Sequence, residues 1–178
     1  MHHPDYRTKY ADNLKRELPR IPFAPLTPDP SPPDYQGRGE KSGFRAFATA
    51  GEQLARLHLD YEELDPWPLK WVETPGVPLS YRVEKMKLNR DKTELSVNPS
   101  PKLTGIPPVV FRYRLGNRSA LEWVIDQYQT SEDKRSGIQS DPNRADDPEY
   151  IVRLVGQVVR VSVETVKIVE GLRGEYGG

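Results

Sequence analysis

Prolines limit which parts of this chain can form regular secondary structure. They occupy positions 19, 22, 25, 28, 30, 32 and 33, and glycines follow at 37 and 39. Each proline removes a backbone donor and fixes φ, so neither a helix nor a central strand can run through them. The sequence therefore predicts a loop over residues 19–41, of which 26–41 is a Pro- and Gly-rich insertion.

The composition restricts the class of protein further. The chain has 178 residues, about the length of one domain, and we expect a single domain over 1–178 with a flexible tail at 173–178. Hydrophobic residues make up 35% and the mean hydropathy is −0.74, and no apolar run approaches the ~18 residues of a membrane span. The absence of cysteine excludes disulfides and thiol chemistry. With no signal-peptide pattern at the N-terminus, we expect a cytoplasmic protein.

Apolar spacing at helical period predicts helices over residues 4–17, 42–59, 119–128 and 148–172. Ser42 is the expected N-cap of the second helix, and Ser119 with Glu122 fits a capping box for the third. The buried face expected for the second helix comprises Phe44, Phe47, Ala48, Gly51, Leu54, Ala55 and His58. We interpret His58 as a structural residue, because no partner histidine or cysteine lies near it in sequence. Alternating valines at 159–163 would also suit a strand, but the length of the last segment favours a helix.

Alternating side chains predict strands in the middle of the chain. A hairpin is expected over 79–88 and 93–98, with two short strands over 102–106 and 109–115 and a turn at Gly116–Asn117. Residues 61–78 are expected to be a connector that Trp67 and Trp71 anchor to the core, and residues 129–147 a polar loop. The predicted fold class is α+β, with helices flanking a small, mainly antiparallel sheet and with long Pro-rich and polar loops.

The sequence contains no convincing catalytic motif. Neither GxxxxGK[ST] nor GxGxxG occurs, and there are only three histidines. The sequence Asn98-Pro99-Ser100-Pro101 lacks the aromatic residue of an amino-methylating turn. The sequence Glu132-Asp133-Lys134 is only a fragment of a metal-nuclease pattern, and a solvated charge run explains it better. We therefore expect no catalytic residue, no metal site and no cofactor.

The charge is unevenly distributed, although 26 basic residues balance 26 acidic ones. Residues 81–118 carry a formal charge of +6, and the remainder carries −6. The nine basic residues of this segment are Arg82, Lys85, Lys87, Arg90, Lys92, Lys102, Arg112, Arg114 and Arg118. A basic sheet and turn region suits a polyanion, because lysine and arginine neutralise phosphates and release counterions. A solvated sheet face without a partner is the alternative.

Particular residues of this segment suit particular contacts with DNA. Arg82, Lys85, Lys87, Arg90 and Lys92 are candidates for phosphate contacts. Arg112, Arg114 and Arg118 are candidates for base edges, since arginine can bond guanine bidentately, and the first two would share one face of a strand. Asn117 could approach adenine, but tolerance of left-handed backbone in a turn is the simpler role.

Several segments of the sequence occur in the same order in a known protein family. They are ELPRIPF (17–23), AGEQLARLHLDYE (50–62), YRVEKMKL (81–88), LTGIPP (103–108), YRLGNRSALEWVIDQYQ (113–129), DKRSGIQSDPN (133–143) and VVRVSVETVKIVEGL (158–172). Together they resemble the C-terminal specificity region of type ISP restriction–modification enzymes and related large adenine-specific DNA methylases. The resemblance runs from about residue 4 to 173. The insertion at 26–40 stands where a shorter connector is expected.

The resemblance implies a role rather than a reaction. It suggests a non-catalytic target-recognition module of bacterial defence that helps a DNA methyltransferase hold and read double-stranded DNA. Met1 resembles a start inside a longer frame, as in a shortened form, a split-gene product or a remnant without activity of its own. A second hypothesis is a fragment that docks onto a separate methyltransferase or translocase chain through the helices at 4–17 and 148–172. Exposure of Val158, Val161 and Val166 would favour docking. A third is an independent nuclease that uses Asp133.

Overall fold

The computed structural model describes residues 8, 11–12 and 38–174. Two compact units are present, one formed by His58–Val166 and the other by the residues up to Leu57 together with those from Lys167. The helix predicted over 4–17, apart from residues 8 and 11–12, lies outside the described residues, as do 19–37 of the predicted loop. None of the described helices is both long enough and apolar enough for a membrane span.

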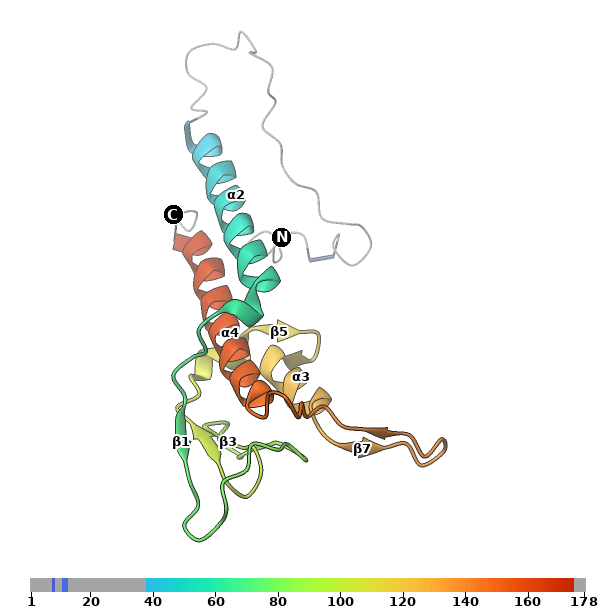
Figure 1. The fold of residues 1–178 in the computed structure, drawn as a ribbon. Coiled ribbons are helices and arrows are strands. Elements are labelled where there is room, and N and C mark those ends of the chain that lie inside the picture. Colours follow the sequence, from blue (N-terminus) through green and yellow to red (C-terminus); the bar gives the residue numbers. More distant parts are fainter. Residues whose placement is uncertain (1–7, 9–10, 13–37, 175–178) are drawn as a thin grey trace, which may run out of the picture. The chain divides into compact units, whose positions relative to one another are not determined.

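The helices and strands follow one another in a mixed order, which confirms the predicted α+β class. They are α2 (Arg38–Leu59), η1 (Tyr61–Glu63), β1 (Lys70–Val72), β2 (Lys87–Leu88), β3 (Glu94–Ser96), β4 (Lys102–Thr104), η2 (Pro108–Arg112), β5 (Arg114–Leu115), β6 (Arg118–Ser119), α3 (Ala120–Gln127), β7 (Ser131–Glu132), β8 (Gln139–Ser140) and α4 (Tyr150–Gly174). Most of these elements are labelled in Figure 1.

The larger unit is built on a four-stranded antiparallel sheet with the order β1-β4-β3-β2. Leu95 of β3 stands opposite Leu103 of β4, and neither side chain is exposed. Their neighbours along both strands are polar and half-buried, as the alternation of side chains in a strand requires. On the polar face, Lys102 lies 3.2 Å from Glu94. One face of the sheet therefore belongs to the core.

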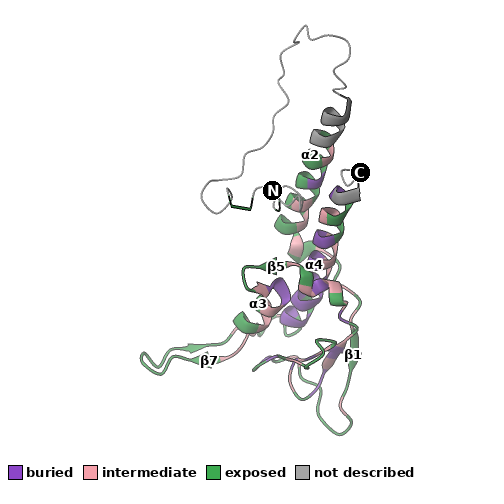
Figure 2. Cartoon of the chain, turned by 180° about the vertical axis from the view of Figure 1, so that it is seen from behind, coloured by how far each residue is buried: buried purple, intermediate pink, exposed green. Residues whose placement is uncertain are grey.

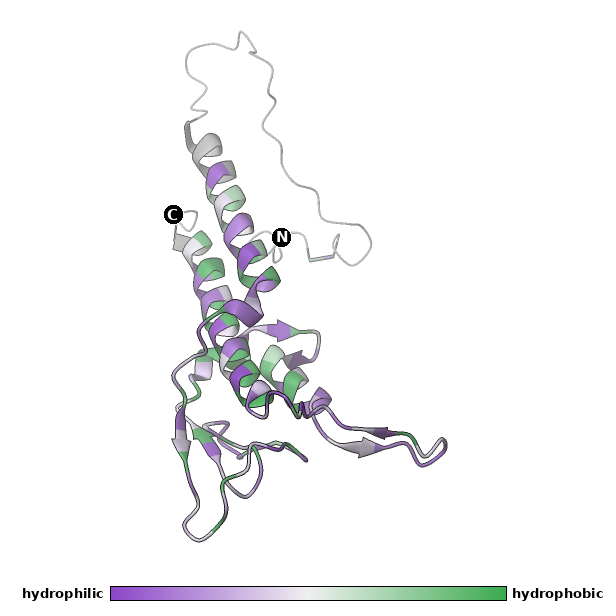
Figure 3. Ribbon diagram, viewed as in Figure 1, coloured by the Kyte–Doolittle hydropathy of each residue, from purple (hydrophilic) through white to green (hydrophobic). Residues whose placement is uncertain are grey.

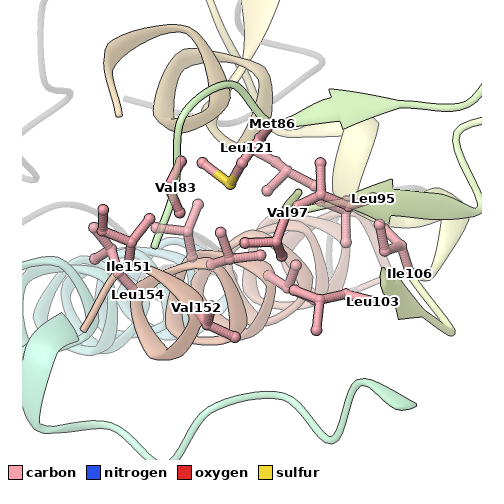
Figure 4. Close-up of a cluster of buried hydrophobic side chains, with 14 of the residues drawn as sticks. Val83, Met86, Leu95, Val97, Leu103, Ile106, Leu121, Ile151, Val152 and Leu154 are labelled. Carbon is pink, nitrogen blue, oxygen red and sulfur yellow. The ribbon is translucent and has the colours of Figure 1, made fainter. Parts of the chain in front are cut away.

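Helix α4 covers that face with the valine-rich stripe of the sequence. Ile151, Leu154, Val155 and Val159 are buried with the two sheet leucines and with Leu121 of α3. Figure 4 shows side chains from the sheet, from α4 and from α3 meeting in this cluster. The predicted helix over 148–172 is confirmed, and it extends to Gly174, so the first two residues of the predicted tail are helical.

A connector crosses α4 closely. The Trp67 amide donates to the Gly156 carbonyl at 3.0 Å. The Gln157 side chain, 3% exposed, donates to the carbonyls of Glu62 and Leu64 at 2.6 and 3.1 Å. Trp67 packs against the core as predicted, whereas Trp71 is 44% exposed on β1. Trp71 stands opposite the buried Leu103, and its ring centroid lies 5.4 Å from that of Tyr81, which packs against the core, so Trp71 contacts the edge of the core without being buried in it.

Helix α2 begins at Arg38, inside the predicted loop, because the prolines end at Pro33 and residues 38–41 can be helical. Ser42 is consequently inside the helix and is not its N-cap. The predicted buried face is also wrong in part. Among residues 45–59 of the helix, Ala50 is the buried position, whereas Phe47 is 39% exposed and Ala48, Gly51, Ala55 and His58 are exposed as well.

The predicted strands are shorter than expected, and one is largely a helix. Residues 87–88 and 94–96 form the predicted hairpin, and 102–104 the next strand. Residues 108–112 instead form a 3-10 helix, because Pro108 presets its first turn and cannot donate to a sheet. Within the predicted 109–115 strand, only residues 114–115 pair as a strand. Arg112 and Arg114 therefore do not share a strand face.

Two further hairpins complete the larger unit. Strands β5 and β6 flank the predicted Gly116–Asn117 turn, in which Gly116 has φ +70°. Strands β7 and β8 pair within the segment predicted as a polar loop over 129–147, so that prediction is wrong for 131–132 and 139–140. Figure 2 shows the β7–β8 hairpin exposed along its length, and Figure 3 shows it largely hydrophilic.

Candidate nucleic-acid interface

A shallow hollow of about 460 Å³ lies between the β2–β3 hairpin, the β5–β6 hairpin and helix α3. Five of the nine residues predicted to contact DNA line it: Lys85, Lys92, Arg114, Asn117 and Arg118. They come from three segments of the chain, and the fold brings them together. The remaining lining residues are Met86, Leu88, Glu122, Ile125, Asp126 and Gln129.

Lys92 is held in the hollow by two contacts of its ammonium group. It lies in the β2–β3 turn with φ 56°, and the Asn89 carboxamide supports that turn by accepting from the amides of Thr93 and Glu94. The Lys92 ammonium donates to Glu122 Oε1 at 2.6 Å and stands 4.9 Å from the centre of the Phe111 ring. This lysine therefore joins the sheet hairpin to helix α3.

Glu122 combines that ion pair with the cap of α3. Its carboxylate accepts from the Ser119 amide at 2.8 Å, and the Ser119 hydroxyl accepts from the Glu122 amide, so the predicted capping box is confirmed. The hydrogen bond from Lys92 and then that from the Ser119 amide lower the pKa of Glu122 from 4.5 to about 2. The carboxylate is ionised at neutral pH and cancels the charge of Lys92.

Arg118 is paired in a similar way. Its Nη1 donates to Asp126 Oδ2 at 2.7 Å, and its guanidinium carbon lies 5.3 Å from the centre of the Trp123 ring. Trp123 is fixed in turn, since its indole N–H donates to the Leu115 carbonyl at 2.9 Å. Arg118 therefore also forms a contact between the β5–β6 hairpin and α3.

Lys85 and Arg114 are the cations of the hollow that have no acidic partner among the described residues. Both are exposed. The Arg114 guanidinium donates to the backbone carbonyl of Asn117 across the β5–β6 turn, which directs it along the hairpin. Asn117 does not have a positive φ, because Gly116 takes the left-handed position of this turn. The role expected for Asn117 in the turn is therefore wrong, and its exposed side chain lines the hollow.

The other four predicted residues lie outside the hollow. Arg82 pairs with Asp141 at 2.6 Å. The Asn143 side chain and amide, followed by Arg82, lower the pKa of Asp141 to about 2. Lys87 is exposed on β2, an edge strand of the sheet, and Arg90 is exposed in the following turn. Arg112 is exposed at the end of η2.

Two residues that were not predicted to contact DNA, His58 and Asn98, have structural roles. The His58 ring nitrogen Nε2 lies 2.9 Å from the Tyr113 hydroxyl and 3.5 Å from Thr165 Oγ1, as expected for a structural histidine. The Asn98 carboxamide donates to the carbonyls of Ser80 and Arg82 and so holds a loop. Within the described part of the chain, no three potential metal ligands gather in one place.

Sequence reasoning missed two basic residues at the tip of the β7–β8 hairpin, Lys134 and Arg135. The predicted polar loop concealed them, because two-residue strands leave no clear alternation in sequence. The signal that could have found them is the turn-forming Ser136–Gly137 pair between short polar runs. Gly137 takes φ 68° there, and both basic residues are exposed.

Comparison with known proteins gives the family. The family model of the Type ISP C-terminal specificity domain matches residues 1–154. The chain belongs to this family. The match confirms the resemblance seen in the sequence over most of the length of this chain. No curated protein sequence gave a significant match.

Three solved structures are similar to this specificity domain. They are the ATP-dependent Type ISP restriction–modification enzyme LlaBIII bound to DNA (31% identity, TM-score 0.76), a nuclease-deletion mutant of the Type ISP restriction–modification enzyme LlaGI in complex with a DNA substrate mimic (34%, 0.75) and the DrdV–DNA complex (34%, 0.71). Each match covers 96% of this chain. The domain spans only 10%, 12% and 16% of the lengths of those proteins.

Proposed function

We propose that this specificity domain binds double-stranded DNA and contributes target recognition to a restriction–modification DNA methyltransferase. The observation that carries the proposal is the match, over 96% of the chain at 31–34% identity, to three proteins whose structures contain DNA. In this proposal the domain performs no catalysis. The methyltransferase and translocase chemistry belongs to another chain or to another part of a larger enzyme.

The charge balance of the hollow supports the proposal and ranks its residues. Lys92 with Glu122 and Arg118 with Asp126 are neutral pairs. Lys85 and Arg114 retain a net positive charge at the surface, where a phosphate or a guanine edge could take the place of water. We assign phosphate contact to Lys85 and base contact to Arg114, with Asn117 beside it as a candidate for adenine.

The basic residues outside the hollow have more limited roles in this proposal. Lys87 and Arg90 continue the positive surface along the β2–β3 hairpin and would add phosphate contacts. Arg82 supports structure through Asp141. Lys92 and Arg118 hold the hollow in shape, and Arg112 is the weakest candidate because it belongs neither to the hollow nor to the β2–β3 hairpin.

A docking role for α4 finds no support. Val158, Val161 and Val166 are 9%, 6% and 8% exposed, so this stripe packs within the chain. The other helix of that hypothesis, 4–17, lies mainly outside the described residues. The nuclease hypothesis also lacks support, because the Asp133 carboxylate accepts from the backbone amides of Arg135 and Ser136 as the cap of a turn.

The experiment measures the salt dependence of duplex binding by fluorescence anisotropy for matched double variants. The double variant Lys85→Gln/Arg114→Gln removes the phosphate contact of Lys85 and the base contact of Arg114, so the log–log salt slope should fall by about 1 in magnitude. The variant Arg118→Gln/Asp126→Asn removes one cation and one anion, so its slope should stay at the wild-type value. Equal slopes for both variants would remove the hollow from the interface.

A single variant tests the base contact. Arg114→Ala should weaken binding to the preferred sequence by roughly 1–3 kcal/mol and relax the preference for one base pair. Lys70→Gln is the control, because Lys70 is exposed on β1 at the opposite edge of the sheet from β2. Unchanged affinity and specificity for Arg114→Ala would contradict the assignment of Arg114.

A further inference from the structure

The β7–β8 hairpin is a projecting ribbon with an unusual distribution of residues. Every residue from 131 to 140 is exposed, and Ile138 is exposed to 67%. Lys134 and Arg135 stand at the tip. A single exposed apolar side chain is common on protein surfaces, but here it lies on the same projecting ribbon as two exposed cations. Figure 1 shows the hairpin extending away from the helices around it.

The tip has a defined conformation. The Asp133 amide donates to the Ile138 carbonyl at 2.9 Å, and the Gly137 amide donates to the Asp133 carbonyl at 2.7 Å. The Asp133 carboxylate accepts from the amides of Arg135 and Ser136 at 2.7 and 3.2 Å. That carboxylate is therefore turned into the backbone, whereas the cations of Lys134 and Arg135 have no acidic partner among the described residues.

The base of the ribbon is fixed to the core. Thr130, before β7, donates to the Glu84 carbonyl through both its amide and its hydroxyl. Asn143, after β8, accepts from the Val83 amide at 2.7 Å and donates to the Val83 carbonyl at 2.8 Å. Val83 is fully buried in the core, so both ends of the ribbon attach to one segment that is anchored there.

That segment also leads into the hollow, since Lys85 follows two residues after Val83 and lines it. A two-stranded ribbon has the width that the major groove of B-DNA admits, and the groove presents acceptors to arginine and methyl groups to apolar side chains. We propose that the β7–β8 hairpin enters the major groove of the DNA. Lys134 contacts phosphate, Arg135 contacts a purine edge, and Ile138 contacts the groove floor. This inference rests on the proposed DNA-binding function.

Proteolysis of the wild-type chain gives the first test. Trypsin cleaves after Lys134 and Arg135, and mass spectrometry can follow each cleavage separately. A saturating duplex should slow cleavage at both sites by on the order of tenfold, whereas cleavage after Lys70 should stay constant. Equal cleavage with and without bound DNA would overturn the inference.

Variants and an altered duplex give the second test. Lys134→Gln should lower the salt slope by about 1 in magnitude, and Arg135→Gln should weaken preferred-sequence binding on the order of tenfold. A duplex made with 7-deazapurines lacks the N7 acceptors of the major groove and keeps the minor groove. It should weaken wild-type binding severalfold and affect Arg135→Gln less. Ile138→Ser should weaken binding without changing the salt slope.

The outcomes separate the two proposals. If the folded wild-type chain binds no duplex, the proposed function fails. If it binds, and Lys85→Gln/Arg114→Gln loses binding while the hairpin variants keep it, only the hairpin inference fails. Because the altered side chains are exposed, circular dichroism should show unchanged folding in each variant.

Discussion

The glycine where the connector crosses α4 gives a sharp test of the fold. A Cβ added to Gly156 would stand 2.7 Å from Pro66 Cβ and 3.4 Å from the Trp67 carbonyl oxygen. Carbon atoms in contact normally lie about 3.5–4.0 Å apart, so the connector or the helix must move. Movement is restricted, because Gln157 and the Trp67 amide hold the same crossing.

The cost of Gly156→Ala follows from three contributions. Overpacking of a close contact costs about 1–3 kcal/mol, and weakening the Trp67–Gly156 hydrogen bond costs about 1 kcal/mol. Alanine gains about 1 kcal/mol of helix propensity over glycine. We expect the free energy of unfolding to fall by about 1–3 kcal/mol, measured by urea unfolding with circular dichroism.

A second glycine of the same helix is the control. A Cβ at Gly171 would meet nothing within 4 Å, so Gly171→Ala should stabilise the protein by about 0.5–1 kcal/mol. The two substitutions are chemically identical and should have opposite signs. If Gly156→Ala proved as stable as Gly171→Ala, the close crossing of connector and helix would be refuted.

Three other perturbations follow from particular contacts. Glu122→Gln should lower stability on the order of 2 kcal/mol at neutral pH. Because the folded-state pKa is lowered, this difference should persist above pH 4.5 and vanish as the pH falls towards about 2, which urea unfolding across pH can follow. Arg82→Gln should increase hydrogen exchange at the Asn143 end of the β7–β8 hairpin, whereas Arg56→Gln should not. Lys87→Gln should weaken duplex binding more than Lys70→Gln at low salt, by anisotropy.

Elements with local signals were predictable from sequence. The capping box of Ser119 and Glu122 set the start of α3, and the apolar stripe of 148–172 predicted α4. The turn-rich Asn89–Lys92 stretch predicted the β2–β3 hairpin, because an Asn side chain can accept from its own turn. In each case the signal is carried by residues that lie close to one another in sequence.

Elements that depend on distant partners, or whose local signals conflict, were not predictable from the sequence. Strand β1 forms among prolines because Trp71 pairs with Leu103 of β4, more than thirty residues later. The 3-10 helix at 108–112 alternates like a strand in sequence, yet Pro108 initiates a helical turn. The buried face of α2 was predicted incorrectly, because the small Ala50 is buried whereas the large Phe47 is exposed.

The candidate site was predictable in position but not in electrostatics. The basic segment 81–118 contains the five predicted residues that line the hollow. The sequence did not show that two of these cations are neutralised, because Glu122 and Asp126 lie after the basic segment. They meet Lys92 and Arg118 only in the folded structure. The positive charge that remains in the hollow, on Lys85 and Arg114, is therefore smaller than the formal charge of +6 on residues 81–118 suggests.

The most direct measurement is selection of bound sequences from a random duplex pool by the purified chain. A target-recognition domain should bind with an affinity that falls steeply with salt, and successive rounds should enrich one sequence motif. Arg114→Ala, selected in parallel, should relax that motif at one position. A folded chain that binds no duplex at low salt, or whose bound pool equals the input pool, would contradict the account.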